Sequence, residues 1–345
     1  MQAAPPDSES SATPAVSVLV PILNEARYLG ETMPPILAQQ CEGGLEFLLL
    51  DGGSDDGTLE ILEGLAATDP RIRVLPNPGR HQSAALNIGL TEARAPLICR
   101  MDAHTRYPPG YVQAGVDRLG RGDVAWAAGP AIAVGLDRWS RRVALALSSR
   151  LGVGGAGFRL ALDREAETDT GFCGVIAAET LREVGGWDED WAINEDGELA
   201  ARVRGAGGKI VCIPDMAAEF IARDSLDGLA RQYWRYGLGR ARTSLRHPGS
   251  LRRSHLLPPA LVLTLAGALV APRRLRTACR LALGLYLATL GAESARLASR
   301  AGPGDAAWLP PVFATMHLGW GAGFLLGAVR GLLSRSPGRR RGRAA

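Results

Sequence analysis

Lysine is almost absent from this sequence: Lys209 is the only one, so nearly every basic side chain is an arginine. Lys+Arg (39) exceed Asp+Glu (35) only slightly, and much of the arginine follows residue 230. The positive charge is therefore weak overall and gathered in the C-terminal part. This distribution does not favour a nucleic-acid-binding face, and we expect no nucleic-acid partner.

Cysteine is also scarce, and no two cysteines have the Cys-x-x-Cys spacing of a zinc or redox motif. The odd number and wide separation exclude a disulfide framework, and we expect reduced thiols in a cytosolic domain. The cysteines are Cys41, Cys99, Cys173, Cys212 and Cys279.

The first residues lack the apolar core of a signal peptide. Residues 1–14 contain acids and prolines, which favour a short disordered leader.

Apolar segments alternate with helical patterns over the first hundred residues or so. Strands that are apolar throughout predict a mostly parallel sheet with helices on both faces. The predicted strands are 16–22, 45–51, 71–75 and 96–102, with helices over 58–67 and over 83–93, the latter capped by Ser83. Further on we expect a strand over 124–134, a mobile loop over 150–170, a strand and helix within 171–190, a helix over 194–208 and a strand over 209–214.

Polar side chains follow the predicted strands where each one ends. Asn24, Glu25, Asp51 and Asp102 all occupy such positions. Ligands bind at the carboxyl ends of parallel strands, so these residues predict a binding site.

The stretch 98–106 (ICRMDAHTR) places Arg100, Asp102 and His104 on one side of a strand end, because side chains alternate along a strand. A carboxylate and an imidazole two residues apart can both ligate Mn²⁺ or Mg²⁺. The alternative interpretation is an ordinary surface loop.

Three uncharged or nearly uncharged runs follow residue 255, at 256–272, 281–292 and 306–329. The last is long enough to cross a bilayer, although buried helices of a soluble core have similar composition. We expect membrane-associated helices over 241–330 and a basic tail over 331–345. If the tail is cytoplasmic, the last two runs would form an in-out-in hairpin, and the first would be re-entrant or interfacial.

Five motifs in order resemble those of the family 2 glycosyltransferases, which are inverting enzymes with the GT-A fold. The resemblance covers roughly residues 15–240, and the form RMDAH with the apolar C-terminus most resembles family members that build exopolysaccharides. The motifs are PILNE (21–25), DGGSDDGT (51–58), NIGLTEARAPLICRMDAH (87–104), GFCG (171–174) and EDGELAAR (195–202).

This resemblance implies a donor site. Asp102 and His104 match the metal-binding Asp-x-Asp of the family, with His104 in place of the second acid. Asp55 and Asp56 are better interpreted as turn formers, and Arg100 either approaches the diphosphate or forms a salt bridge at the sheet edge. The implied donor-binding residues are Pro21, Asn24, Glu25, Asp51, Arg100, Asp102 and Arg235.

The resemblance also implies a catalytic base and an acceptor side. Asp196 matches the family's general base, which takes the acceptor's proton as its hydroxyl attacks the anomeric carbon. Trp187 has core packing as an alternative role, and QYWRY (232–236) has an amphipathic interfacial helix as one. The implied acceptor-side residues are Gly171, Gly174, Trp187, Glu195, Gln232 and Tyr236.

The sequence therefore predicts an inverting glycosyltransferase that uses a nucleotide-sugar, a divalent cation (Mn²⁺ or Mg²⁺) and a lipid-linked polyprenyl saccharide acceptor. Its catalytic domain (15–240) would lie on the cytoplasmic side of the cell membrane. Alternatives are a nucleotidyltransferase acting on sugar phosphates and a non-enzymatic membrane-tethered scaffold. A processive synthase is disfavoured because it needs more spanning helices.

Overall fold

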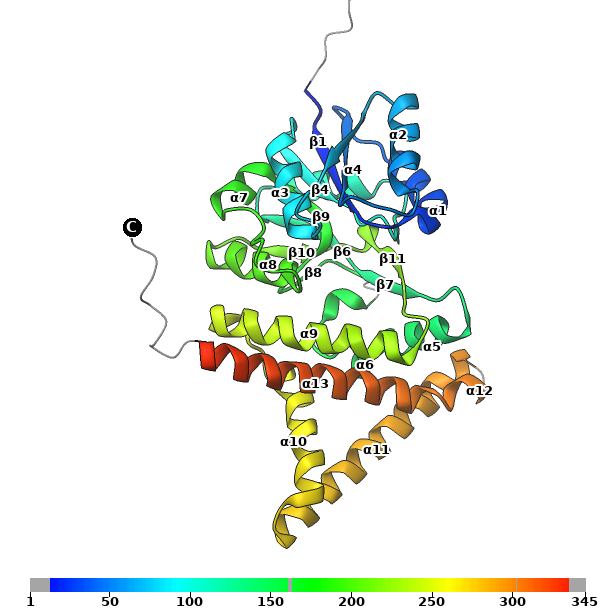
Figure 1. Ribbon diagram of the computed structural model, residues 1–345, viewed down its shortest axis with the longest axis vertical. Helices are drawn as coiled ribbons and strands as arrows, with labels where there is room; N and C mark the ends of the chain where they lie inside the picture. The colour runs from blue at the N-terminus through cyan, green and yellow to red at the C-terminus, as the bar shows by residue number, and fades with distance from the viewer. Residues whose placement is uncertain (1–12, 161–162, 302, 335–345) are drawn as a thin grey trace, which may run out of the picture.

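The computed structural model describes residues 13–160, 163–301 and 303–334, so most of the predicted leader and tail lie outside the described residues. Within these ranges the central sheet has the order β3-β2-β1-β4-β9-β6-β10-β8 (Figure 1). Strands β1 to β4 are parallel, whereas β9 runs antiparallel between β4 and β6, which confirms a mostly parallel sheet. The strands are β1 (Val16–Ile22), β2 (Leu45–Asp51), β3 (Ile72–Pro76), β4 (Leu97–Arg100), β6 (Trp126–Gly129), β8 (Ala166–Glu167), β9 (Phe172–Ala177) and β10 (Ile210–Cys212).

Helices cover both faces of this sheet because successive strand residues point to opposite sides. Val18 and Val20 of β1 belong to one buried cluster, and Leu19 between them belongs to the other. The first cluster includes residues of α1 (Ala26–Leu37), α2 (Thr58–Thr68) and α4 (Tyr111–Leu119). The second includes residues of α3 (Gln82–Glu92), α7 (Ala178–Glu183) and α8 (Glu195–Gly205).

The single strand predicted over 124–134 is wrong. Pro130 separates β6 from β7 (Ala131–Val134), which belongs to a second sheet with the order β5-β11-β7. Proline has no N–H for a continuous ladder, and at Gly129 an added Cβ would lie 1.6 Å from the Met216 carbonyl oxygen. The chain therefore changes sheets here. The partners of β7 are β5 (Thr105–Arg106) and β11 (Ala218–Ile221), and a 3₁₀ turn, η2 (Pro214–Met216), precedes β11.

Two further local predictions are wrong. The segment 150–170 is not a plain loop, since its described residues form α6 (Arg150–Val153), the 3₁₀ turn η1 (Gly157–Arg159) and β8. Helix α3 is capped by His81, whose Nδ1 accepts from the Ala84 N–H, and Ser83 instead donates to the Trp191 carbonyl.

Helices α9 (Leu226–Arg246) and α13 (Leu309–Ser334) lie side by side beneath the second sheet (Figure 1). Glycines bring their backbones together: a Cβ at Gly323 would lie 2.2 Å from the Trp234 carbonyl oxygen, and one at Gly237 would lie 2.1 Å from that of Trp320. We call this contact the glycine seam. The predicted domain boundary at 240 falls inside α9, so it crosses one continuous helix, and the division remains a prediction.

The apolar runs form helices, and the predicted in-out-in crossing stays a prediction. α10 (Leu257–Val270) packs with α11 (Arg273–Ala301), and the two form a hairpin that projects from the molecule, whereas α13 lies along α9 (Figure 1). By length and composition alone, Arg253–Val270 and Gly304–Leu333 could cross a membrane. The remaining short elements are α5 (Arg138–Leu147), α12 (Pro303–Ala306), η3 (Pro248–Ser250) and η4 (Arg253–Leu256).

Candidate active site

A cavity of about 1340 Å³ opens where β4 ends and α8 begins. It extends past the side chains of α9 to the first turns of α10 and the middle of α13. Most of the sequence-predicted site residues lie on its wall. These are Glu25, Arg100, Asp102, His104, Gly171, Glu195, Asp196, Gln232, Arg235 and Tyr236.

Arg100 is the centre of the charged network in this cavity. Its side chain is buried and donates through Nε to Asp102 Oδ1 at 3.0 Å, and through Nη1 to Asp196. Its Nη2 lies 3.5 Å from Glu195 Oε1. Of the two predicted roles for Arg100, the structure therefore shows the salt bridge.

Asp196 reaches this network because α8 starts abruptly. Asn194 precedes the helix with a φ of 63°, and its Nδ2 donates to Thr243 Oγ1 of α9 at 2.9 Å. A Cβ at Gly197 would lie 2.7 Å from the Asn194 amide, so glycine is needed beside the cap. Together these contacts hold the first turn of α8 at the cavity wall.

Burial raises the pKa of Asp196 to about 8, in opposition to Arg100 and with help from the neighbouring charges of Glu195 and Asp102. A carboxylate with a pKa near neutrality is well suited to accept a proton in turnover. The environment therefore gives Asp196 the property that a general base requires.

Asp102 has a different environment. Burial opposes its ionisation, but Arg100 and His104 hold its pKa below the usual value. Its backbone N–H donates to Tyr107 Oη at 2.6 Å, and its Oδ1 also accepts from Gln82 Nε2 at 3.1 Å. Asp102 is therefore a fixed, ionised carboxylate at the cavity wall.

His104 lies beside Glu25, with Nδ1 3.2 Å from Glu25 Oε1. Desolvation disfavours the charged form of the His104 ring, but Glu25 and Asp102 favour it more strongly. The pKa of His104 is therefore raised. Across the ranges that the structure describes, no cluster of three or more His, Cys, Asp or Glu side chains is arranged for a metal.

The other predicted donor residues do not line the cavity. Asp51 accepts from Ser54 Oγ at 2.6 Å and from the Gly53 N–H at 2.9 Å, so its own turn uses both oxygens. Asn24 Oδ1 accepts from the Asp55 N–H, and Pro21 lies within β1 opposite Leu50. These residues shape the turn beside the cavity. Asp56 caps Thr58, as expected of a turn former.

Two of the predicted acceptor-side residues, Gly174 and Trp187, do not line the cavity. Gly174 has a φ of 102° and packs on β6, where only glycine fits. Trp187 is buried in the core against α3, which is its alternative role. Gly171 does reach the cavity, although a Cβ there would lie 2.6 Å from the Trp126 ring. All five cysteines are free, as expected.

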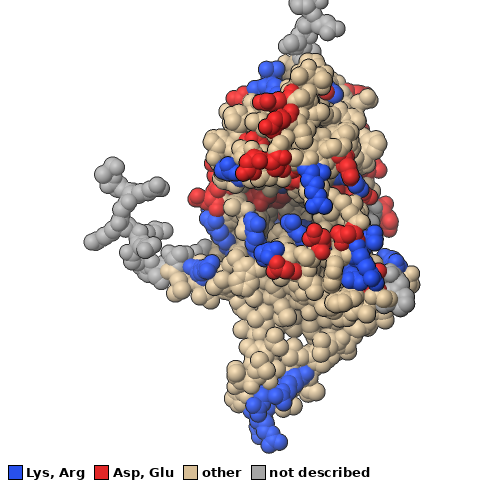
Figure 2. Space-filling view, turned by 45° about the vertical axis from the view of Figure 1, so that its right-hand side comes forward, with Lys and Arg blue, Asp and Glu red and all other residues tan. Residues whose placement is uncertain are grey.

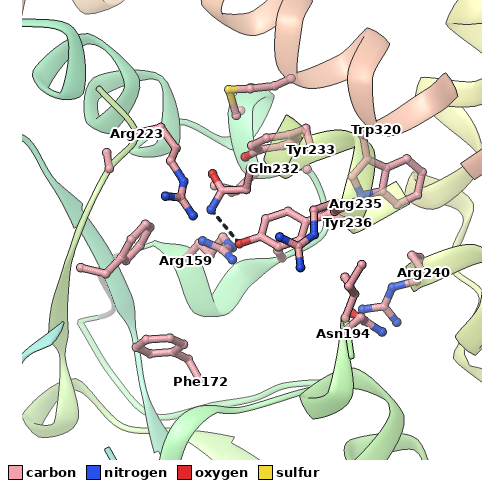
Figure 3. A pocket seen from close by; sticks show the side chains of 18 of the residues that line it. Arg159, Phe172, Asn194, Arg223, Gln232, Tyr233, Arg235, Tyr236, Arg240 and Trp320 are labelled. Carbon is pink, nitrogen blue, oxygen red and sulfur yellow. Dashed lines mark hydrogen bonds between the residues drawn. The ribbon is translucent and has the colours of Figure 1, made fainter. Parts of the chain in front are cut away.

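Helix α9 contributes one face to the cavity. Gln232 Nε2 donates to Tyr236 Oη at 3.0 Å, and Arg235 lies beside them (Figure 3). Further arginines that no sequence motif indicated also line the cavity, among them Arg159, Arg223 and Arg240. The helical spacing of Gln232, Tyr236 and Arg240 was the available signal for the last of these.

Comparisons with known proteins agree with this geometry. The family model described as "Glycosyl transferase family 2" matches residues 17–185. The "Succinoglycan biosynthesis protein ExoA" of Rhizobium meliloti (strain 1021) is 33% identical over 322 residues, which cover 89% of this chain and 93% of that protein. The chain belongs to glycosyltransferase family 2.

Two further proteins resemble this family 2 glycosyltransferase at lower sequence identity. An "Undecaprenyl-phosphate 4-deoxy-4-formamido-L-arabinose transferase" of Pseudomonas syringae pv. syringae (strain B728a) is 29% identical over 137 residues, covering 35% of this chain and 41% of that protein. The mannosyltransferase PcManGT from Pyrobaculum calidifontis, solved with GDP-Man and Mn²⁺, has a TM-score of 0.61 at 20% identity, covering 94% of this chain and 89% of that one. The latter likeness confirms the GT-A fold.

Proposed function

We propose that this glycosyltransferase moves one sugar, with inversion, from a nucleotide-sugar to a lipid-linked saccharide during exopolysaccharide synthesis. One observation carries the proposal: Asp102 and Asp196 meet at Arg100 in a cavity that continues to the apolar C-terminal helices. The names of the succinoglycan and undecaprenyl-phosphate relatives support the product and acceptor class.

Asp196 is the proposed base. An acceptor hydroxyl placed in the cavity would give its proton to the Asp196 carboxylate as it attacks the anomeric carbon opposite the leaving diphosphate. Arg100 holds that carboxylate in place, and Glu195 adds negative charge beside it. An α-linked donor would yield a β-linked product.

Asp102 and His104 are the proposed ligands of Mn²⁺ or Mg²⁺. Both line the cavity, and a carboxylate oxygen and an imidazole nitrogen, with Glu25 nearby, fit a cation that takes its remaining ligands from substrate oxygens and water. The cation would neutralise charge on the departing diphosphate. The mannosyltransferase PcManGT, which shares the fold, was solved with Mn²⁺, and this supports the assignment.

Family membership favours glycosyl transfer over the nucleotidyltransferase and scaffold alternatives. The apolar helices and basic flanks support a location at the cytoplasmic leaflet of the cell membrane. In Figure 2 the sides of the α10–α11 hairpin lack charged side chains, and its tip is basic.

The test is a nucleotide-sugar binding and hydrolysis screen with and without Mn²⁺. It compares the wild type with Asp102→Ala and Asp196→Asn. We expect metal-dependent binding of one donor that Asp102→Ala abolishes, whereas Asp196→Asn binds but loses about 10²–10⁴-fold in turnover. Near-normal turnover of Asp196→Asn would refute its role as the base.

A further inference from the structure

Four arginines form a basic wall of the cavity. Arg159 follows α6, Arg223 follows β11, and Arg235 and Arg240 lie on α9. Figure 3 shows their side chains around the same space, with Arg223 at one end and Arg240 at the other, on the side of Trp320. This basic wall and the carboxylates around Arg100 are parts of one cavity.

Unlike Arg100, the arginines of the basic wall are not paired with carboxylates of the described residues. Throughout the part of the chain that the structure describes, none of its arginines has a carboxylate within ion-pair distance. Arg159 instead lies over the rings of Phe220 and Tyr236, at 5.4 and 5.7 Å. Unpaired guanidinium groups of this kind are suited to a polyanionic ligand.

Arg240 is a half-buried member of the basic wall. Burial lowers its pKa to about 10, which means that the surroundings disfavour its charge. A half-buried charge with no carboxylate partner is disfavoured, and an anion bound beside it would offset that cost. Arg240 therefore marks the end of the wall at which an anionic group is most needed.

Beyond Arg240 the cavity becomes apolar. His255 lies beside the Trp320 ring of α13, and Leu257 and Leu261 of α10 with Ala282 of α11 line this apolar lobe. The outer surfaces of the same hairpin carry exposed leucines, including Leu263 and Leu281 at 60% and 71% exposure. An anion site followed at once by an apolar lobe matches an amphipathic ligand with a phosphate head and a hydrocarbon chain.

We infer that Arg240, with Arg235 and Arg159, holds the diphosphate of a lipid-linked acceptor, and that the apolar lobe holds the first isoprenoid units of its chain. The inference rests on the proposed function and assigns a subsite to it. Arg223 lies at the opposite end of the wall in Figure 3, so it is not part of this subsite. The donor diphosphate belongs at Asp102, so the inference moves Arg235, which the family resemblance implies for the donor, to the acceptor.

The first experiment measures binding of full-length protein in detergent to two probes, a short polyprenyl diphosphate and a nucleoside diphosphate with Mn²⁺. Arg240→Gln should weaken the polyprenyl diphosphate by about tenfold or more and change nucleotide binding less than about twofold. Arg246→Gln is the matched control, because Arg246 lies on α9 but pairs with Asp188 outside the cavity.

Equal losses for both probes would assign the basic wall to the donor and overturn the inference, as would unchanged lipid binding. A second variant keeps the test valid if Arg240→Gln does not fold. Leu261→Trp should fill the apolar lobe, weaken the polyprenyl diphosphate and leave inorganic diphosphate unaffected. Retained lipid binding in Leu261→Trp would contradict the subsite.

Donor hydrolysis separates this inference from the proposed function. If the wild type hydrolyses a nucleotide-sugar but Arg240→Gln keeps full lipid affinity, only the subsite is wrong. If the wild type neither binds nor hydrolyses any donor, the proposed function itself is wrong.

Discussion

Arg100 and Asp196 form an ion pair although 96 positions separate them in the chain. Arg100 ends β4 and Asp196 lies in the first turn of α8, so the pair joins a strand end to a helix start. A guanidinium can bond several carboxylate oxygens at fixed angles, which a smaller cation cannot do. The position of the proposed base therefore depends on one buried arginine.

Replacing Arg100 by lysine tests this dependence. Arg100→Lys keeps the charge but cannot bond Asp102, Glu195 and Asp196 together, so we expect turnover to fall by about 10²-fold. The lysine should also stabilise the ionised Asp196 less than Arg100 does, so the pKa of Asp196 should rise further. The acidic limb of the rate profile would then move to higher pH. Steady-state kinetics across pH measures both effects.

The control for this change is Arg118→Lys. Arg118 is equally buried and bonds Asp123 and Glu165, neither of which lines the cavity. We expect lower stability from Arg118→Lys but no movement of the acidic limb. If the acidic limb of the rate profile moved equally in both variants, the movement would come from a general structural effect and not from the contact with Asp196.

The pKa of Asp196 sets a pH dependence for the wild type. The base must be ionised, and its pKa is raised to about 8, so kcat/KM should increase with pH up to about 8 and fall about tenfold per unit below it. An acidic limb centred near pH 4 would contradict the environment assigned to Asp196.

The glycine seam predicts opposite signs for two alanine substitutions. Gly323→Ala places a Cβ 2.2 Å from a backbone oxygen of α9, so we expect a loss of about 1–3 kcal/mol in the free energy of unfolding. Gly291→Ala, within α11, meets nothing within 4 Å and should gain up to about 1 kcal/mol from helix propensity. Thermal unfolding in detergent compares them, and equal shifts would argue against the seam.

Exposed leucines of the hairpin predict its role in membrane binding. Leu269 and Leu281 are 69% and 71% exposed, and replacing both by glutamate should lower binding to lipid vesicles by about tenfold or more. Flotation with vesicles measures this, with Ile61→Glu as the control because Ile61 is exposed on α2, at the other end of the molecule. Unchanged flotation of the double variant would exclude the hairpin as the contact.

The alternation of strands and helices could be predicted from the sequence because apolar runs and turn residues are local signals. Strand-end spacing placed Glu25 and Asp102 correctly at the cavity but also included Asn24 and Asp51, which do not line it, and only the family resemblance pointed to Asp196. Pro130 was a local warning against one continuous strand, but which sheet each half joins depends on the tertiary contact of Gly129 with Met216.

Other features depend on contacts that no local pattern encodes. The sequence leaves Trp187 open between the acceptor side and the core, and its ring packs in the core beside α3, where its backbone N–H bonds Asn87, a hundred positions away. The basic wall has no sequence signature because Arg159 and Arg223 are distant in the chain from α9. The pairing of α10 with α11 was equally hidden because all three apolar runs look alike.

The glycine seam also fixes the distance between the reaction centre and the α10–α11 hairpin. Because α13 is locked along the helix that lines the cavity, the reaction centre and the hairpin cannot move apart freely. If the hairpin enters the bilayer, the proposed base stands at a constant height above the lipid headgroups. The enzyme would then select acceptors by length. In a glycan with too few or too many sugars between the lipid and the reacting hydroxyl, that hydroxyl would not reach the base, whatever the terminal sugar.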